Sequence, residues 1–275
     1  MQSRIAVIAP GAMGAAVGSR LSAAGCDVVT LLDGRSAASV RRAAAAGMRG
    51  VALAELGQAD MVLSIVPPGE ARALAERLVP VLNPAGIYVD CNAVCPETVR
   101  DIGTVVAAAG IRFVDAGIVG GPPRPGYDPV FYASGTDAPA FARLAGHGLK
   151  VQVLEGPVGA ASAMKMSYAG ISKGLIGLGS AMILGAIRGG SADALRAELA
   201  ASQPMLLAWF ERHVPGMFPK AYRWVAEMEE ISAFLAADPA AAKIFEGMSE
   251  LYARLAADEA GETDALAGFL TPGRG

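Results

Sequence analysis

The first half of the chain alternates short apolar segments with helix-like segments, and this alternation constrains the fold more than any other feature. The predicted strands are residues 4–9, 28–32, 61–66, 87–90, 112–116, 130–134 and 151–154. The predicted helices among them are residues 11–24, 36–46, 70–82, 96–109 and 139–144. Strands joined by helical crossovers form a mostly parallel sheet with both faces covered. The pattern therefore predicts an α/β domain of the doubly wound, Rossmann type.

The character of the sequence changes near residues 156–159. No convincing strand follows, and helices are predicted at residues 160–188, 191–213, 218–236 and 239–256. The first of these helices contains Gly170, Gly174, Gly177 and Gly179. Each costs roughly 1 kcal/mol in an exposed helix, so we expect close helix–helix contacts to offset them. The sequence thus predicts an α/β domain over residues 1–158 and an all-helical C-terminal domain over residues 159–275, beginning with a long interdomain helix.

Composition and charge limit the kinds of partner that we expect for this chain. The 275 residues have a formal net charge of −3 and show no basic stripe, so we expect no nucleic-acid partner. The apolar segment at residues 174–187 spans only about two-thirds of the length that a bilayer requires, so we expect a buried helix and no membrane. Cys26, Cys91 and Cys95 form an odd set without neighbouring metal ligands. They predict free thiols in the reducing cytoplasm and no metal site.

A glycine-rich turn follows the first predicted strand and opens the first predicted helix. It reads Ala9-Pro10-Gly11-Ala12-Met13-Gly14, so Ala9 replaces the first glycine of the G-x-G-x-x-G pattern. Backbone N–H groups at such a helix start bind a pyrophosphate, and the helix dipole favours its charge. The candidate cofactor-binding residues are Gly11, Ala12, Met13 and Gly14. Residues 1–158 are therefore a candidate dinucleotide-binding domain, with plain strand–helix packing as the alternative role of the glycines.

Asp33 ends the second predicted strand about 20 residues further on, as the dinucleotide-binding pattern requires. Its carboxylate can accept hydrogen bonds from the adenosine ribose, which slightly favours NAD. Arg35 and Ser36 stand nearby and offer an alternative site for the 2′-phosphate of NADP. The expected cofactor is NAD or NADP, with a slight preference for NAD. Val66 and Pro67 end a strand at the carboxyl edge of the sheet, where ligands bind.

Three further segments resemble motifs of the β-hydroxyacid dehydrogenase family, which includes 3-hydroxyisobutyrate and 6-phosphogluconate dehydrogenases. Residues 89–96, with the sequence VDCNAVCP, are similar to the family's D-x-S-T-x-x-P turn. Residues 115–121, with the sequence DAGIVGG, are similar to D-A-P-V-S-G-G. Residues 156–171 resemble the G-x-x-G…K-M-x-x-N-G-I run. Together with the glycine-rich turn, these segments occur in the family's order and spacing.

The resemblance implies an oxidoreductase in which Lys165 is the general acid and base. Lys165 lies in an otherwise uncharged stretch, and burial beside a positively charged nicotinamide lowers the pKa of such an ammonium. The alternative is a lysine whose ammonium reaches solvent at a domain boundary. The resemblance also implies that the loop at Val66 and Pro67 runs along the cofactor. The candidate substrate-binding residues are Asn92, Val119, Gly120, Gly121, Tyr168 and Lys173.

Two of these assignments have a direct chemical reason. Gly120 and Gly121 let a carboxylate approach backbone N–H groups, and the Asn92 amide can donate to it. A plain loop turn is the alternative for the glycine pair. Other positions depart from the family, because Val119 replaces a substrate-binding serine and Tyr168-Ala169 replaces a pair ending in a substrate-binding asparagine. Tyr168 and Lys173 are candidates for the missing polar contacts, with core packing as the alternative for Tyr168.

The leading hypothesis is an NAD(P)-dependent dehydrogenase that interconverts a small hydroxy acid and its oxo acid. The departures argue against 6-phosphogluconate and 3-hydroxyisobutyrate as substrates. Imine reduction on the same fold is a second hypothesis, against which Lys165 argues, and a dinucleotide-binding module without catalysis is a third. The run from Lys165 to Gly174 resembles a bacterial branch of the family with a distinct helical C-terminal domain. Relatives are typically dimers, so the resemblance also implies a homodimer built by a helical substrate and dimerisation domain.

Overall fold

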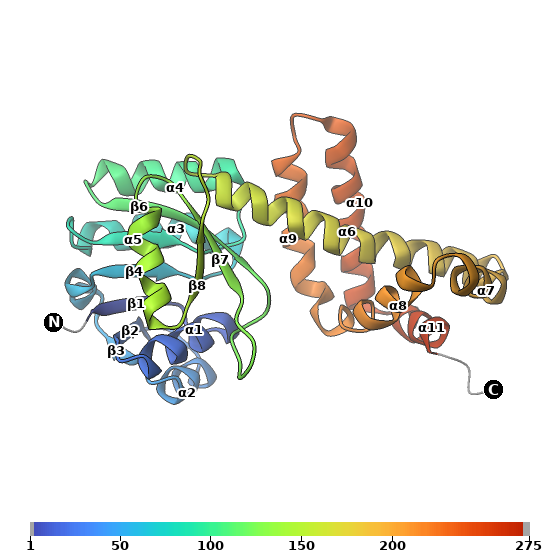
Figure 1. The fold of residues 1–275 in the computed structure, drawn as a ribbon, viewed down its shortest axis with the longest axis horizontal. Coiled ribbons are helices and arrows are strands. Elements are labelled where there is room, and N and C mark those ends of the chain that lie inside the picture. The colour runs from blue at the N-terminus through green and yellow to red at the C-terminus, as the bar shows by residue number, and fades with distance from the viewer. Residues whose placement is uncertain (1–2, 272–275) are drawn as a thin grey trace. The chain divides into compact units, whose positions relative to one another are not determined.

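The computed structural model describes residues 3–271, and the chain divides into two compact units (Figure 1). The first unit is Met1–Met166 and the second is Ser167–Gly275. The division falls inside the long helix α6 (Ala160–Arg188), about two turns after its start, whereas the sequence favoured the loop before this helix. The first unit is α/β and the second is helical, which confirms the predicted fold class.

The first unit is built on one sheet of eight strands. They are β1 (Arg4–Ile8), β2 (Asp27–Leu31), β3 (Arg49–Val51), β4 (Met61–Ser64), β5 (Ile87–Asp90), β6 (Arg112–Val119), β7 (Val130–Ser134) and β8 (Lys150–Val153). Their order is β3-β2-β1-β4-β5-β6-β7-β8, and every neighbouring pair is parallel except β6 and β7. The sequence missed β3, a short edge strand whose first two residues are exposed and give no apolar signal.

Helices cover this sheet. They are α1 (Ala12–Ala23), α2 (Ala37–Ala45), α3 (Ala71–Leu78), α4 (Pro96–Ala108) and α5 (Ala138–Ala142), with 3-10 turns at Leu53–Gln58, Pro68–Glu70, Val79–Val81 and Arg143–His147. The predicted helix at residues 70–82 is shorter than expected because a 3-10 turn with Pro80 replaces its last turn. Ser36 starts α2 by accepting a hydrogen bond from the Ser39 N–H at 3.3 Å.

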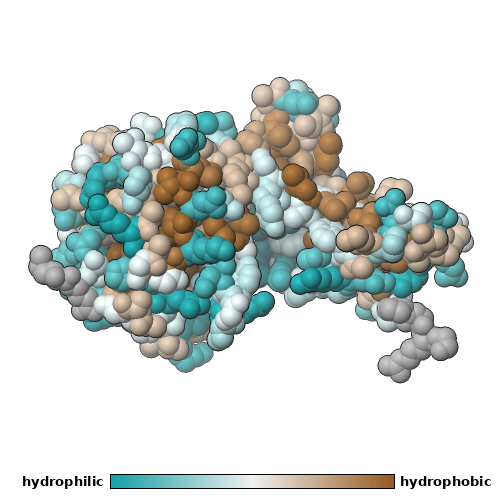
Figure 2. Space-filling model, viewed as in Figure 1, coloured by the Kyte–Doolittle hydropathy of each residue, from teal (hydrophilic) through white to brown (hydrophobic). Residues whose placement is uncertain are grey.

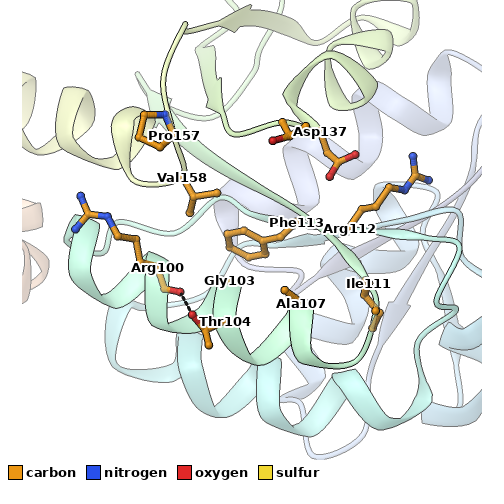
Figure 3. A pocket seen from close by; sticks show the side chains of 12 residues that line it. Arg100, Gly103, Thr104, Ala107, Ile111, Arg112, Phe113, Asp137, Pro157 and Val158 are labelled. Atoms are coloured by element: carbon orange, nitrogen blue, oxygen red, sulfur yellow. Dashed lines mark hydrogen bonds between the residues drawn. The ribbon is translucent and has the colours of Figure 1, made fainter.

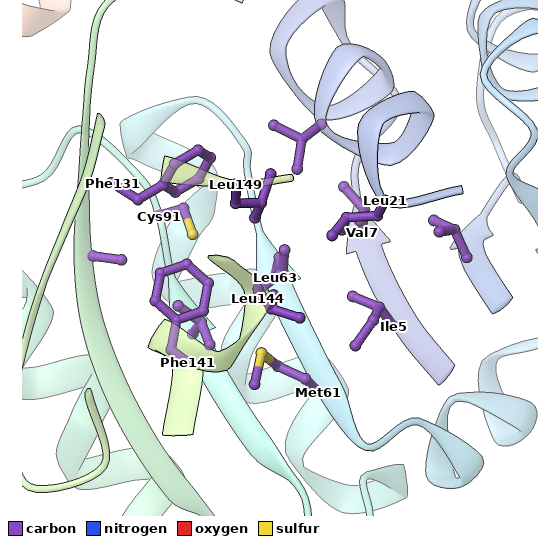
Figure 4. Close-up of a cluster of buried hydrophobic side chains, with 14 of the residues drawn as sticks. Ile5, Val7, Leu21, Met61, Leu63, Cys91, Phe131, Phe141, Leu144 and Leu149 are labelled. Carbon is purple, nitrogen blue, oxygen red and sulfur yellow. The ribbon is translucent and has the colours of Figure 1, made fainter. Parts of the chain in front are cut away.

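Both faces of the sheet are buried. Ile5 and Val7 of β1 point into one apolar cluster, and Ala6 and Ile8 point into the other. Figure 4 shows the first cluster, in which Leu63 and Phe141 lie among side chains from several strands and helices. Side chains alternate along a strand, so a strand that is apolar at every position requires a cover on each face. This is why the parallel strands read as unbroken apolar runs in the sequence.

The order of the strands creates a switch point between β1 and β4. The chain moves outward from β1 to β2 and β3, and then returns to β4 on the other side of β1. The connections that follow β1 and β4 therefore leave the carboxyl edge of the sheet in opposite directions. In open α/β sheets this divergence opens a crevice at the carboxyl edge, which is the usual ligand site.

The second unit contains the rest of α6 together with α7 (Ala192–Ser202), α8 (Pro204–His213), α9 (Ala221–Phe234), α10 (Pro239–Ala257) and α11 (Glu262–Leu270). The single helix predicted at residues 191–213 is two helices, because Pro204 cannot continue the hydrogen-bond ladder of α7 and instead begins α8. Helix α11 was not predicted. A Cβ on Gly177 would lie 2.4 Å from Met248 Sδ, and one on Gly179 would lie 2.4 Å from a Phe210 ring carbon. The predicted close helix–helix contacts of α6 are therefore confirmed.

Candidate functional site

The glycine-rich turn lies at the carboxyl end of β1, next to the switch point. Gly11 is the N-cap residue of α1, no side chain caps this helix, and its first turn contains no acidic residue. Gly11 and Ala12 are exposed, and Met13 is half-buried. The first N–H groups of a helix have no intrahelical acceptor, so this helix start offers backbone donors and a positive dipole end to an anion.

The two glycines of the turn have different roles. A Cβ on Gly14 would lie 2.0 Å from the Ala9 carbonyl oxygen, so Gly14 allows α1 to pack closely on the end of β1. A Cβ on Gly11 would meet no atom within 4 Å, and the Gly11 φ of −70° suits any residue. Packing therefore accounts for Gly14 alone. The space around Gly11 is open, which leaves room for a dinucleotide pyrophosphate to approach the backbone.

The loop after β2 brings polar groups to the same edge of the sheet. Asp33 and Arg35 are exposed, and Ser36 uses its hydroxyl to cap α2. Arg42 of α2 donates through Nε to the Pro10 carbonyl oxygen at 3.1 Å, which brings its guanidinium beside the glycine-rich turn. Sequence reasoning missed Arg42, because an arginine on a short polar helix carries no local sign of a tertiary contact.

Asn92 joins the loops that follow β4 and β5. Its side-chain oxygen accepts the Val66 N–H at 2.7 Å, and its Nδ2 donates to Ser64 Oγ at 2.9 Å and to Asp90 Oδ2 at 2.8 Å. Asn92 is 3% exposed, and an amide nitrogen has only two hydrogens to donate. Both amide hydrogens of Asn92 therefore have acceptors within the protein, and its predicted contact with a substrate carboxylate stays a prediction. Asn92 fixes the loop at Val66 and Pro67, and Pro67 is exposed.

Lys165 meets this network through the backbone. Its Nζ donates to the Asn92 carbonyl oxygen at 3.2 Å, and its side chain is half-buried. A Cβ on Gly117 of β6 would lie 2.9 Å from Lys165 Cβ, so the start of α6 packs directly on this strand. The structure thus brings the predicted residues Lys165, Asn92 and Val66 together at the carboxyl edge.

Asp115 holds the start of α6, and the sequence identified it only as part of a motif. Its Oδ2 accepts from Ser134 Oγ and from the N–H groups of Gly159, Ala161 and Ser162 at 2.9–3.1 Å, and its Oδ1 accepts from Ser162 Oγ at 2.7 Å. Asp115 is fully buried. A carboxylate at this place satisfies the free N–H groups of the helix and complements its dipole. Since Lys165 lies one turn further along, Asp115 also orients the lysine.

Asp90 is a second buried carboxyl group in this network. The pKa of Asp90 is raised to about 7, mainly by burial and to a smaller extent by the charge of Asp115, against the hydrogen bonds from Asn92. The positive charge of Lys165 lowers it. Burial also raises the pKa of the neighbouring Cys91 thiol well above its usual value. The site therefore contains a carboxyl group that gains or loses its proton near neutrality, and a thiol that stays protonated.

The glycine pair follows β6 at the same edge. Val119 ends the strand and is half-buried, whereas Gly120 and Gly121 are exposed. Gly120 has a φ of +124°, which disfavours any side chain there. The Gly121 N–H donates to Tyr127 Oη at 3.1 Å. The backbone donor that the sequence assigned to a carboxylate therefore has a protein acceptor in this structure.

Tyr168 and Lys173 lie in the second unit, so the structure does not assign them to the cluster around Lys165. Tyr168 is 55% exposed, which argues against its alternative role in core packing. Lys173 forms an ion pair with Glu227, and its Nζ lies 5.1 Å from the centre of the Trp224 ring. The Lys173 charge is therefore already compensated within the helical unit.

A pocket of about 690 Å³ lies away from this edge (Figure 3). It is lined by side chains that include Arg100 of α4, Arg112 and Phe113 at the start of β6, and Asp137. Neither Lys165 nor the glycine-rich turn lines this pocket, so it differs from the carboxyl-edge crevice where ligands usually bind in this fold. Among residues 3–271, no three His, Cys, Asp or Glu side chains gather into a metal-binding cluster.

Comparisons with known proteins fit this geometry. Residues 4–146 match the model of the NAD binding domain of 6-phosphogluconate dehydrogenase. Residues 186–255 match a domain of unknown function, DUF1932. No curated protein sequence matches the chain significantly.

Solved structures extend the likeness to both units. MTH1747, a conserved protein of unknown function with structural similarity to 3-hydroxyacid dehydrogenases, is 30% identical over 92% of this chain and 99% of its own, with a TM-score of 0.72. A conserved hypothetical protein from Sinorhizobium meliloti is 22% identical over 98% and 97% of the two chains, with a TM-score of 0.76. A 3-hydroxyisobutyrate dehydrogenase from Mycobacterium tuberculosis, solved with L-serine, is 19% identical over 98% and 99%, also with a TM-score of 0.76.

Proposed function

The chain belongs to the β-hydroxyacid dehydrogenase family, and from that premise we propose that it is an NAD(P)-dependent oxidoreductase that interconverts a small hydroxy acid and its oxo acid. The observation that carries the proposal is the contact of the Lys165 ammonium with the Asn92 carbonyl oxygen at the carboxyl edge of the sheet. This contact holds a proton-transferring group at the edge where the glycine-rich turn opens. The two features together are what a hydroxy-acid dehydrogenase requires.

The residues around the glycine-rich turn fit a dinucleotide. The start of α1 would hold the pyrophosphate at Gly11, Ala12 and Met13, and Gly14 would keep the helix close to β1. The loop at Val66 and Pro67 would line the cofactor. When bound, the dinucleotide supplies the hydride acceptor or donor.

We further propose NAD as the preferred form, with Asp33 as the acceptor for the ribose hydroxyls. Arg35 and the Arg42 guanidinium beside Pro10 support the alternative that the protein prefers NADP. Ser36 supports it less, because its hydroxyl already caps α2. Michaelis constants for the two cofactors decide between them. A strong preference for NADP would overturn the assignment to Asp33.

Lys165 would act as the acid and base. In the oxidation direction the neutral amine accepts the hydroxyl proton, and in the reduction direction the ammonium returns it to the oxo group. The Asn92 carbonyl oxygen accepts one N–H of the lysine, which holds the ammonium at the carboxyl edge. The substrate carboxylate would bind near Gly120 and Gly121, at the end of the strand on which Lys165 packs.

Replacing Lys165 tests the proposal. Lys165→Met should lower kcat by roughly 10²–10⁴-fold while the affinity for NAD+ or NADP+ stays close to that of the wild type. The matched control is Lys150→Met, an exposed lysine at the start of β8 in the same unit. The assay is the change in nicotinamide absorbance with a panel of hydroxy and oxo acids. Unchanged turnover by Lys165→Met would refute the role.

The same assay, extended to cyclic imines, separates the alternatives. Reduction of cyclic imines without turnover of any hydroxy acid would identify an imine reductase. Dinucleotide binding without turnover of any compound would identify a cofactor-binding module.

We also propose that the protein is a homodimer in which the helical unit forms the interface. The exposed side of α6 carries Ile171, Leu178 and Met182, which are 74%, 53% and 61% exposed. Their spacing of seven and four residues places them along one stripe of the helix. Hydrophobic residues are visible over the α6 part of the helical unit in Figure 2. By length and composition α6 is also apolar enough to cross a membrane, but 39% of its apolar window is buried inside the protein. A partly buried helix with one apolar stripe favours a second protein chain over lipid.

A further inference from the structure

The connection between β6 and β7, residues 120–129, forms a rigid strap at the carboxyl edge. It contains Pro122, Pro123, Pro125 and Pro129, and each proline restricts its backbone. Arg124 and Tyr127 exchange two backbone hydrogen bonds of 3.0 and 2.9 Å across a tight turn. Pro125 and Gly126, with a Gly126 φ of +75°, fill the central positions as a type II turn requires. The strap therefore holds Arg124 and Tyr127 side by side at its tip.

The Tyr127 hydroxyl explains why residue 120 is a glycine. A Cβ on Gly120 would lie only 2.2 Å from Tyr127 Oη, and the neighbouring Gly121 N–H donates to this oxygen at 3.1 Å. The glycine pair thus leaves space for the tyrosine hydroxyl and donates a hydrogen bond to it. A plain loop turn would not require the space above Gly120 to be empty of a side chain.

Tyr127 still has a hydrogen to donate. Its Oη accepts from Gly121, and no acceptor for its own O–H is found among residues 3–271. A hydroxyl that accepts a hydrogen bond becomes a better donor. The Arg124 guanidinium lies 5.0 Å from the centre of the Tyr127 ring, and Arg124 forms no ion pair with any acidic residue in the described part of the chain. The tip of the strap therefore presents a neutral donor and a positive charge together.

Two of the donors that the sequence assigned to the substrate carboxylate already have protein acceptors. The Asn92 amide hydrogens are donated to Ser64 and Asp90, and the Gly121 N–H donates to Tyr127. The side chain of Val119 has no polar atom. The strap begins directly after β6, the strand on which Lys165 packs. Gly120 lies three positions after Gly117, or about 10 Å along an extended chain. A lysine side chain and a small hydroxy acid can together span this distance.

We propose that Tyr127 and Arg124 recognise the substrate carboxylate, with the Tyr127 O–H as donor and the Arg124 guanidinium as counter-charge. This inference rests on the proposed function and names the residues that select its substrate. The strap is held in place from its other side as well, because Asp128 accepts from Arg20 of α1 at 2.5 Å. The recognition residues are thus tied to the helix that begins at the cofactor turn.

A competing hypothesis predicts the opposite change in substrate affinity when the Tyr127 hydroxyl is removed. If the substrate carboxylate displaced the Tyr127 hydroxyl from the Gly121 N–H, removal of that hydroxyl would free the backbone donor and strengthen binding. If the hydroxyl is itself a ligand, its removal weakens binding. Tyr127→Phe therefore distinguishes the two readings by the direction of the change.

The experiment measures equilibrium binding to the full-length protein saturated with NAD+ or NADP+. The probes are 3-hydroxypropionate, a minimal hydroxy acid, and 1,3-propanediol, which lacks the carboxylate. Tyr127→Phe should weaken binding of the acid by about tenfold and leave binding of the diol unchanged. Arg124→Gln should weaken binding of the acid and reduce its dependence on salt. Arg143→Gln, an exposed arginine at the end of α5, is the matched control and should behave as the wild type.

Each other outcome overturns the inference. These outcomes are equal or tighter binding of the acid by Tyr127→Phe, an equal loss for the acid and the diol, or a wild type that binds the dinucleotide but not the acid. Because the readout is binding and not turnover, it stands apart from the test of Lys165. A protein that binds the acid through Tyr127 but never oxidises it would sink the proposed function and keep this recognition site.

Discussion

At the scale of single residues, Gly14 is closely packed whereas Gly11 faces open space, so we expect different effects when each is replaced by alanine. Gly14→Ala places a Cβ against the Ala9 carbonyl oxygen and should lower the free energy of unfolding by about 1–3 kcal/mol. Gly11→Ala meets no atom and should leave this free energy close to that of the wild type, but it should weaken binding of NAD+ or NADP+. Urea unfolding and dinucleotide titration of both variants check the pair. Equal dinucleotide affinity in Gly11→Ala and the wild type would argue against a pyrophosphate at this turn.

Asp90 makes a prediction about pH. Burial raises the pKa of its carboxyl group to about 7 in the folded protein, whereas the unfolded carboxyl group has a pKa near 4. Between about pH 4 and pH 7 the folded state therefore binds more protons, so this group makes the protein less stable as the pH rises through that range. Asp90→Asn removes the ionisation, and its free energy of unfolding relative to the wild type should increase between about pH 4 and pH 7.

Urea unfolding at several pH values across that window checks the prediction. Asp101→Asn, at an exposed carboxyl group on α4, is the control and should follow the wild-type pH dependence more closely. Parallel curves for Asp90→Asn and the wild type would contradict the raised pKa.

The residues that sequence reasoning could find are those with a local signature. Gly11 and Gly14 follow a strand and open a helix, and Lys165 is a lone charge in an apolar stretch. Arg42 carries no such signal, and Asp115 was found only as part of a motif, because their contacts join segments that are far apart in the chain. Tyr127 lies in a loop without a periodic pattern. The sequence also could not show that both amide hydrogens of Asn92 have protein acceptors, since Ser64 and Asp90 become neighbours only in the sheet.

At the scale of elements, the start of α6 depends on Asp115. Asp115→Ala would leave the buried N–H groups of Gly159, Ala161 and Ser162 without this acceptor and should lower the free energy of unfolding by about 2–4 kcal/mol. Asp115→Asn keeps the shape and one accepting oxygen, so its loss should be smaller. Chemical denaturation of both variants is the measurement. A loss below about 0.5 kcal/mol in Asp115→Ala would show that α6 does not depend on this cap.

Most elements followed from periodicity and from local stop signals. The strand β7 and the helix α6 have the predicted bounds, because each is an uninterrupted pattern between clear breaks. The strand β3 and the division between α7 and α8 were missed for different reasons. The strand has three residues and little burial, and Pro204 was read as part of one helix although it suits the first position of a new one.

At the scale of the whole molecule, the stripe on α6 predicts the state of association. Leu178→Glu places a charge on the stripe and should convert a dimer into a monomer of 27.9 kDa without loss of helical content. Met205→Glu changes another exposed hydrophobic residue of the helical unit, away from the stripe, and should leave the dimer intact. Light scattering and circular dichroism measure the two properties. A wild-type monomer, or a dimer that survives Leu178→Glu, would remove the stripe from the interface.

The sequence alone determined most of the order of strands and helices, the change from α/β to helical structure, and the position of the glycine-rich turn directly after β1. These properties are local, because backbone geometry and burial on one or two faces impose a period that the residues display directly. Only the tertiary structure decided which polar groups remain available at the carboxyl edge. Each donor and acceptor there is shared among strands β4, β5 and β6, helix α6 and the strap, and hydrogen bonds between distant segments leave no periodic trace in the sequence.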